Sequence, residues 1–508
     1  MAKLGFDSDV YLKQQSQYIV ERAKNLGLDR LYIEFGGKFI YDMHAARILP
    51  GFDPNAKIKL LQVLKDRTDI IICVFAGDIE RRKMRADFGI TYDADVLKLV
   101  DDLREWGLEP KAVIITRFDN QALVKQFMDK LTRRDINVFT HRAIKGYPAD
   151  LDLVVSDEGY GSNPYIEVSK PICVVTAPGP NSGKMATCLS QLYHEHKRGI
   201  KTGYAKFETF PIWNLPLKHP VNVAYESATA DLGDFNCVDP FHLEAYNQVS
   251  INYNRDVEAF PLLKKIIERI MGASNVPYKS PTDMGVNRAG FAITDDLACQ
   301  AAAKQELIRR YFRYSCEYAI GAAAQKTVER AELLMKELNL GPADRLVVGP
   351  ARRAAEDAKH KGKGDGDVYC GAAIELDDGQ GTIVTGKNSP LMHASSAVVL
   401  NAIKRLAGIP DKIDLISKNV LESIGHLKKD VFLVKNVSLD LGEALIALGI
   451  SATTNPTAQF AMEKLKDLKG CEMHMTHMPT PGDEAGLRRL GLNVTSDPNF
   501  ASKHLFTS

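Results

Sequence analysis

The stretch Pro171–His196, PICVVTAPGPNSGKMATCLSQLYHEH, decides the fold of the first part of the chain. Its apolar run Pro171–Thr176 predicts a buried strand, and the residues that follow Lys184 predict a helix. A strand that passes through a glycine-rich turn into a helix directs backbone N–H groups and the positive end of the helix dipole toward an anion. Lys184 adds a mobile positive charge. The stretch therefore favours a phosphate-binding loop.

The loop departs from the Walker pattern G-x-x-x-x-G-K-[ST] at two of its four defining positions. Gly183 and Lys184 match, but Pro178 stands at the first glycine, and Met185 stands where a Ser or Thr would hold Mg²⁺. An ordinary Walker enzyme is therefore not favoured. The alternative is a plain turn from strand to helix with a solvated lysine. The candidate phosphate-binding residues are Gly179, Asn181, Ser182, Gly183 and Lys184.

A magnesium ion at this loop would need ligands from elsewhere. Ser182 and Thr187 are close in sequence, and the segment 224–246 is rich in acidic side chains. Mg²⁺ prefers such oxygen ligands, although turn and helix-cap chemistry explains each acid equally well. The candidate catalytic residues are Lys206, Asp231, Asp234 and His242, and Asp239 is a further possible ligand. A third polar loop, Ser280–Asn287, either closes over this site or caps a helix.

Apolar runs and amphipathic stretches alternate along the first 170 residues. This alternation predicts a mostly parallel α/β sheet. The predicted strands are Arg30–Phe35, Asp69–Phe75, Lys111–Thr116, Asn137–His141 and Leu151–Ser156. Helical periodicity dominates residues 241–340. We therefore expect an α/β domain over residues 1–240, a helical subdomain over 241–340 and a second α/β domain over 341–508.

The last of these domains shows the same alternation. Its predicted strands are Val368–Leu376, Thr382–Thr385 and Val431–Val434, and its predicted helices are Ser395–Ala407 and Leu441–Leu448.

Composition and charge restrict the possible partners. Apolar residues make up 45% of the 508-residue chain and charged residues 25%, which excludes a disordered or coiled-coil protein. Lys and Arg number 65 and Asp and Glu 64, giving a net charge of +1. Because the charges balance so evenly, the protein as a whole has no electrostatic field that attracts nucleic acid or an anionic membrane. We therefore expect neither partner. It also leaves little repulsion against self-association, so we expect a homo-oligomer.

Cysteine usage and hydropathy favour a cytoplasmic location. The eight cysteines are scattered singly, as is usual in a reducing compartment. The first residues lack the apolar run of a signal peptide, and no apolar run reaches the roughly 18 residues of a membrane span.

The segment 369–408, which begins YCGAAIELDDG, resembles the opening of the cytidine-deaminase-like fold. Active zinc deaminases carry H-x-E and a later P-C-x-x-C. Here Ser395 stands two residues after His393 in place of the catalytic Glu, and the chain has no C-x-x-C. His474 and His477 lie on a predicted strand, where their side chains face opposite sides. We therefore expect neither zinc-dependent deamination nor a stoichiometric zinc site.

Several motifs together resemble a widespread bacterial family of uncharacterised conserved proteins. They are LYIEFGGK, DMHAARILPGF, APGPNSGKM, SPTDMGVN, GKNSPLMHASS and HMTHMPTPGDE. The resemblance extends over essentially the whole chain and implies an N-terminal α/β domain, a helical insert and a C-terminal domain of deaminase-like layout. It implies no established activity. Some members carry an ATP-dependent peptidase label, but this chain has neither the G-x-S-x-G nor the H-E-x-x-H motif of a peptidase.

The sequence thus leaves three functions open. The leading hypothesis is an enzyme that binds a nucleotide or a phosphorylated metabolite, with ATP and Mg²⁺ as possible cofactors, and catalyses phosphoryl transfer or ATP-driven ligation. The second is a sensor that binds such a ligand without turnover. The third is a zinc-free transferase at the C-terminal cleft near Asn388 and His393.

Overall fold

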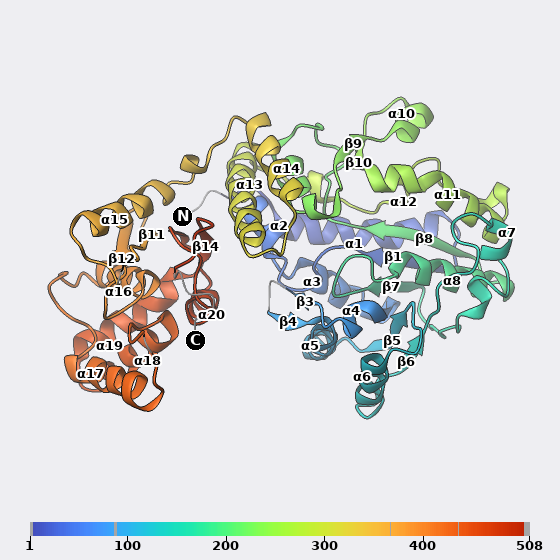
Figure 1. Ribbon diagram of the computed structural model, residues 1–508. Helices are drawn as coiled ribbons and strands as arrows, with labels where there is room; N and C mark the ends of the chain where they lie inside the picture. Colours follow the sequence, from blue (N-terminus) through green and yellow to red (C-terminus); the bar gives the residue numbers. More distant parts are fainter. Residues whose placement is uncertain (1–3, 86–88, 366, 435, 502–508) are drawn as a thin grey trace. The chain divides into compact units, whose positions relative to one another are not determined.

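The computed structural model describes residues 4–85, 89–365, 367–434 and 436–501 (Figure 1). The chain divides into two compact units with the boundary between Ala303 and Lys304. The boundary falls within helix α13 (Asp296–Ala319), inside the stretch 241–340 for which the sequence predicts a helical subdomain. The division into three domains stays a prediction.

A parallel sheet of six strands forms the centre of the first unit. In spatial order the strands are β6 (Val138–Thr140), β5 (Pro110–Thr116), β2 (Thr68–Phe75), β7 (Ile172–Thr176), β1 (Arg30–Phe35) and β8 (Thr202–Phe207). All five residues of β7 are buried, as expected for a parallel sheet that is covered on both faces. The predicted mostly parallel α/β sheet is confirmed.

Two apolar cores lie on opposite faces of this sheet. Alternate strand residues divide between them: Ile33 and Val174 belong to one core, and Tyr32 and Cys173 belong to the other. The helices that cover the first face are α1 (Ser8–Asn25), α2 (Met43–Ile48), α3 (Ala56–Val63), α4 (Ala76–Glu80), α5 (Tyr92–Glu105), α6 (Ala122–Thr132) and α9 (Pro220–Ser227). The helices that cover the second face are α7 (Leu151–Val154), α8 (Lys184–Lys197), α11 (Asn254–Met271) and α12 (Pro281–Met284).

The chain leaves the neighbouring strands β1 and β7 in opposite directions. From β1 it passes through α2 and α3, across the first face, to β2. From β7 it passes through α8, across the second face, to β8. In open α/β sheets, ligands bind in the crevice that such a reversal opens beyond the carboxyl ends of the strands. The loop Ala177–Gly183 directly follows β7 and therefore lies at this topological switch point.

Smaller elements complete the first unit. Strands β9 (Asn236–Val238) and β10 (Ile251–Tyr253) form an antiparallel pair that flanks helix α10 (Pro240–Tyr246), and strands β3 (Met84–Arg85) and β4 (Ile90–Thr91) form another pair.

The predicted strand Leu151–Ser156 is wrong, because its first residues form helix α7. The Asp150 side chain accepts a hydrogen bond from the backbone N–H of Leu153 at 3.0 Å and caps this turn. An Asp at this position favours a helix start over a strand. Val154 still belongs to the apolar core. The apolar run therefore predicts burial correctly, although it predicts the wrong type of secondary structure.

The second unit contains a mixed four-stranded sheet. Its strands, in spatial order, are β12 (Ile383–Lys387), β11 (Gly371–Glu375), β13 (Glu472–Met475) and β14 (Asn493–Ser496). β11 is antiparallel to both neighbours, and β13 and β14 are parallel. The helices are α14 (Gln325–Glu337), α15 (Val348–His360), α16 (Ala394–Leu406), α17 (Lys418–His426), α18 (Leu441–Ala452), α19 (Pro456–Glu463) and α20 (Pro481–Leu490).

The predicted strand Val431–Val434 is also wrong. A π-helical turn, Leu427–Val431, continues α17 instead, and Leu433 has a positive φ of 56°. Phe432 is 61% exposed and Leu433 is 79% exposed, so neither side chain packs as a residue of a buried strand would. Within the described ranges, no helix is both long and apolar enough to cross a membrane.

Exposed apolar side chains gather on α17, α18, α19 and the turn after α17. They are Leu427, Val431, Phe432, Leu433, Ile446, Ile450 and Phe460. Covering them is favourable, so this region is where we expect copies of the chain to associate. Light scattering of the purified protein should give a mass of at least about twice the 56.2 kDa of one chain. Replacing both Phe432 and Leu433 with Asp should shift that mass toward 56.2 kDa. A parent protein that stays at the mass of one chain at micromolar concentration contradicts this expectation.

Candidate functional site

The loop Ala177–Gly183 connects β7 to α8, and in the described part of the chain the N-terminus of α8 has no side-chain cap. Gly183 is the N-cap and has a φ of 86°, in the left-handed region that favours glycine. No side chain in the described ranges caps the N–H groups of the first turn of this 14-residue helix. At Gly179 a Cβ atom would lie 2.4 Å from the Tyr92 ring, so only glycine allows α5 to pack against the loop. The loop therefore offers unpaired amide donors at a helix N-terminus.

The end of β5 holds the loop through its carbonyl oxygens. The hydroxyl of Thr116 donates to the Ser182 carbonyl at 2.7 Å, and the Arg117 guanidinium donates to the Asn181 carbonyl at 2.6 Å. Within the loop, the Ser182 hydroxyl donates to the Gly179 carbonyl at 2.6 Å. These contacts fix the carbonyl groups and leave the amide groups available.

Lys184, the first residue of α8, faces the carboxyl end of β1. Its Nζ lies 3.8 Å from the Glu34 Oε1, which is long for a hydrogen bond, and the two side chains are 10% and 12% exposed. The Tyr204 hydroxyl donates to the other Glu34 oxygen at 2.8 Å. Lys184 is thus held near the switch point by a loose ion pair that an incoming anion can replace.

Five charged side chains gather beside this pair; they come from the end of β8, the start of α11 and the turn before β9. Lys206 Nζ lies 2.7 Å from both oxygens of Asp256 and 3.2 Å from Glu208 Oε1. Arg255 contacts Glu208 at 3.4 Å and Asp234 at 2.8 Å. Residues Glu34 and Lys206 are paired in register across β1 and β8, so the cluster lies on the same face of the sheet as Glu34.

Burial and the ion pairs within this cluster together determine the pKa values of its side chains. Burial acts to lower the pKa of Lys206, but the carboxylates of Asp256 and Glu208 outweigh it and raise that pKa. Burial acts to raise the pKa of Glu208, yet Lys206 and Arg255 lower it. At Asp256, burial dominates and raises the pKa despite Lys206. The cluster therefore keeps two fixed cations next to the loop.

The hydroxyl groups near the loop that the sequence offers for magnesium are already engaged. Met185 packs against the apolar core of the second face. Thr187 is fully buried, and its hydroxyl accepts the Cys73 thiol at 3.4 Å. Among the described residues, no three His, Cys, Asp or Glu side chains are arranged to hold a metal ion. A metal at this edge would need the acidic side chains to exchange their Lys206 and Arg255 partners.

His242 and Asp239 belong to a second polar cluster, which joins α10 to α12. Asp239 caps α10 through the His242 amide and accepts the Thr282 hydroxyl at 2.6 Å. The His242 Nδ1 lies 3.0 Å from the Ser280 hydroxyl. Ser280 and Asp283 form a capping box at the start of α12.

The remaining predicted residues lie at different distances from the loop. The Val286 amide donates to the Lys206 carbonyl at 3.0 Å, so the loop Ser280–Asn287 lies beside β8. Asp231 is exposed on a 3₁₀ turn. The structure thus links Lys206 to Asp234 through Glu208 and Arg255, and it places His242 in the cap cluster.

Comparison with known proteins identifies the family. Residues 4–339 match the family model described as "Domain of unknown function DUF1846, N-terminal", and residues 343–506 match its C-terminal counterpart. The chain belongs to this family. It is 57% identical over 505 residues to a "UPF0371 protein" of Clostridium botulinum (strain Alaska E43 / Type E3), and 56% identical over 504 residues to one of Clostridium tetani (strain Massachusetts / E88). Both alignments cover 99% of each chain. The resemblance to a widespread bacterial family of unknown function is confirmed.

The C-terminal DUF1846 unit contains a partly buried histidine–carboxylate pair. His393 Nδ1 lies 2.8 Å from Asp483 Oδ2, and the Ser395 hydroxyl donates to Asp483 Oδ1 at 2.6 Å. Burial acts to lower the pKa of His393, but the hydrogen bond and charge of Asp483 raise it. The Asn388 side chain holds the residues that precede β11. It accepts a hydrogen bond from the Cys370 amide and donates one to the Val368 carbonyl.

Sequence reasoning assigned no role to four members of the site in the first unit: Glu34, Glu208, Arg255 and Asp256. One signal for Glu34 was available, since a charged residue near the carboxyl end of the apolar run Arg30–Phe35 interrupts a central strand. Arg255 and Asp256 begin a helix that is distant in sequence, and their charges alone gave no sign of their partners.

Removing one member of this cluster should destabilise the fold. Asp256→Asn leaves Lys206 with Glu208 as its remaining carboxylate within 4 Å. We expect the free energy of unfolding in denaturant to fall by roughly 1–3 kcal/mol. Asp231→Asn is the matched control, because that side chain is exposed, and it should change stability by less than about 0.5 kcal/mol. Equal stability of the two variants would show that the cluster is solvated.

Proposed function

We propose that the chain binds a phosphorylated small molecule, either a nucleotide or a phosphorylated metabolite, at the loop Ala177–Gly183 and catalyses phosphoryl transfer or ATP-driven ligation there. One observation carries this proposal: an uncapped helix start and Lys184 lie together at the switch point of a parallel sheet. Amide donors, a helix dipole and a lysine are the elements from which proteins build phosphate sites.

The neighbouring side chains suit a reaction at phosphorus. The amide groups of the first turn of α8 would bind phosphate oxygens, and Lys184 would exchange Glu34 for the phosphate. Lys206 and Arg255 lie beside Glu34 and supply positive charge that is fixed by its carboxylate partners. Prearranged charge of this kind stabilises the negative charge that develops during phosphoryl transfer.

Binding without turnover is the second candidate function. Met185 occupies the position of the metal-binding hydroxyl, and the nearby acids are paired with Lys206 and Arg255. This arrangement favours a sensor over an enzyme that depends on Mg²⁺. Measuring ATP consumption with and without Mg²⁺ separates the two, since a sensor binds ATP and leaves it intact.

A zinc-free transferase that works in the C-terminal unit, at a cleft near Asn388 and His393, is the third candidate. The His393–Asp483 pair favours it, because a carboxylate on Nδ1 orients the ring so that Nε2 can act as a base. The His393 side chain is 21% exposed. If this cleft is the working site, activity will be lost in His393→Ala and kept in Lys184→Ala.

A thermal-shift screen with nucleotides, sugar phosphates and inorganic phosphates tests the binding proposal. Any ligand that binds the native state alone raises the melting temperature by mass action. We expect the phosphorylated compounds to shift the transition and their dephosphorylated forms to leave it unchanged. A screen in which no phosphorylated compound shifts the transition contradicts the proposal.

Lys184→Ala should weaken ATP binding by roughly 1–3 kcal/mol, because a charge-assisted contact to phosphate is lost. Isothermal titration calorimetry measures the effect. Lys197→Ala is the matched control, because Lys197 lies at the far end of the same helix, where its side chain is 52% exposed. Equal ATP affinity in Lys184→Ala and Lys197→Ala would refute the role of Lys184.

A further inference from the structure

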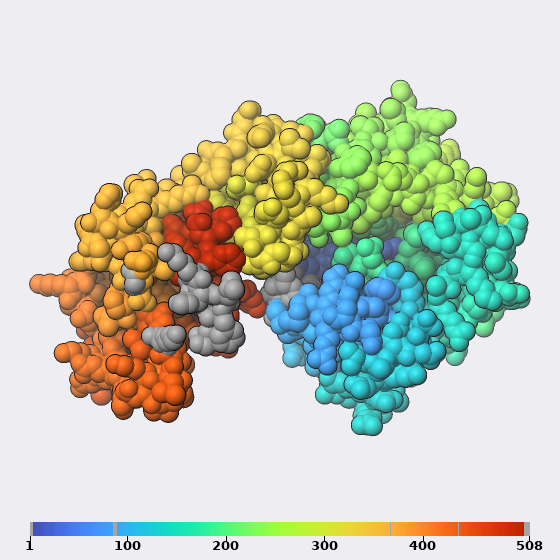
Figure 2. Space-filling view, in the orientation of Figure 1, coloured from blue at the N-terminus to red at the C-terminus, as the bar shows by residue number. Residues whose placement is uncertain are grey.

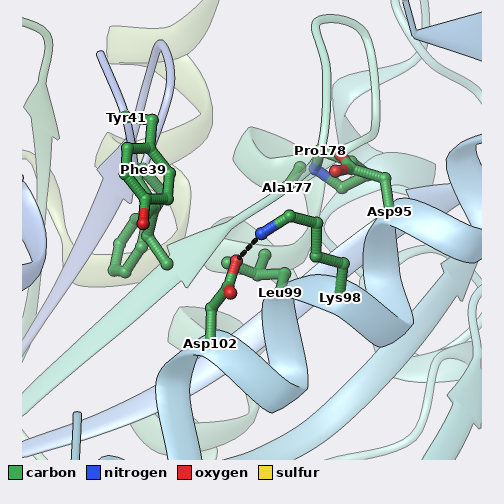
Figure 3. A pocket seen from close by; sticks show the side chains of 9 residues that line it. Phe39, Tyr41, Asp95, Lys98, Leu99, Asp102, Ala177 and Pro178 are labelled. Atoms are coloured by element: carbon green, nitrogen blue, oxygen red, sulfur yellow. Dashed lines mark hydrogen bonds and ion pairs between the residues drawn. The ribbon is translucent and has the colours of Figure 1, made fainter. Parts of the chain in front are cut away.

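A shallow hollow that is open to solvent adjoins the phosphate loop (Figure 3). The loop after β1, the first residues of the loop after β7 and helix α5 surround it. Its lining residues are Phe39, Ile40, Tyr41, Asp95, Lys98, Leu99, Asp102, Ala177 and Pro178. The hollow therefore opens at the same switch point as the loop. Its enclosed space is only about 20 Å³, so a ligand at this place would lie over the hollow and against its rim.

Helix α5 turns polar side chains toward this hollow. Asp95, Lys98, Leu99 and Asp102 follow one another at the spacing that places residues on one side of a helix. Three of these four side chains are polar, although Asp95 is only 4% exposed. Lys98 and Asp102 form an ion pair along α5, one helical turn apart (Figure 3). Figure 2 shows the region of α5 (blue) on the surface of the first unit.

The opposite wall is aromatic. Tyr41 is 51% exposed, and Phe39 lies beside it with a ring that is 5% exposed (Figure 3). The Lys98 ammonium lies 5.8 Å from the centre of the Tyr41 ring. Tyr41 adopts a φ of 55°, a conformation that is rare for a bulky residue. The backbone thus holds an accessible aromatic ring at the rim of a polar hollow.

We infer that this hollow is the nucleoside subsite of the phosphate loop, which makes the ligand a nucleoside phosphate. The Tyr41 ring stacks on the base, and the Asp102 carboxylate accepts hydrogen bonds from the ribose hydroxyls. Carboxylates repel phosphate and accept hydrogen bonds from sugar hydroxyls, so this end of the crevice suits the uncharged part of the ligand. The inference rests on the proposed function, because the phosphates must occupy the neighbouring loop.

Calorimetric titration of the full chain with ATP, tripolyphosphate and 2′,3′-dideoxy-ATP tests this assignment. ATP should bind about tenfold more tightly than tripolyphosphate. Tyr41→Ala should remove that advantage and leave tripolyphosphate binding unchanged, whereas Tyr41→Phe should keep it. Lys184→Ala should weaken both ligands, because it acts on the phosphates.

The ribose contact has its own test. Dideoxy-ATP should bind the parent protein about fivefold more weakly than ATP, and Asp102→Ala should bind both with equal affinity, since the variant has lost the acceptor. Asp101→Ala, with its exposed side chain on the next position of α5, is the matched control and should behave like the parent.

The outcomes separate this inference from the proposed function. If tripolyphosphate binds as tightly as ATP and Tyr41→Ala changes nothing, the subsite is refuted and the phosphate loop stands. The same conclusion follows if a sugar phosphate binds as tightly as ATP and Tyr41→Ala affects neither. If neither ATP nor tripolyphosphate binds the parent protein, both proposals fail.

Discussion

Two neighbouring parallel strands, β1 and β7, send the chain to opposite faces of the sheet, and the rest of the candidate site depends on this reversal. The crossover through α2 and α3 leaves on one side, and α8 leaves on the other. Because the two connections leave on opposite faces of the sheet, a crevice opens between them at the carboxyl ends of β1 and β7. The loop Ala177–Gly183, Lys184 and Glu34 meet there, and the aromatic hollow at Tyr41 extends from the same point.

Charge balance is the second constraint on the site. Burying an isolated charge is costly, so the cations at this edge are held by carboxylates: Lys206 by Asp256 and Glu208, and Arg255 by Glu208 and Asp234. Lys184 differs from them, because its contact with Glu34 is long and single. A phosphate that binds the loop can therefore replace Glu34 as the partner of Lys184 without breaking the ion pairs of Lys206 and Arg255. This difference is why Lys184, and not Lys206, is the expected phosphate ligand.

Local patterns in the sequence predicted the central strands and the succession of strand, loop and helix at β7 and α8 correctly, because each depends on a short run of residues. The apolar run Leu151–Ser156 misled, since one cap at Asp150 changes the type of element without changing its burial. The partners of Lys206 escaped prediction for a different reason. Asp256 is 50 residues away in sequence, and only the packing of α11 against the sheet brings the two together.

Hydrogen-exchange mass spectrometry with and without ATP tests the central claim most directly, because it locates the ligand on the chain. The account predicts that ATP slows exchange in the loop Ala177–Gly183 and in the first turn of α8, where the amide groups are uncapped. Residues 39–41, which line the adjoining hollow, should also gain protection. Protection confined to the segment around His393 and Asp483, or no change anywhere in the chain, would contradict the account.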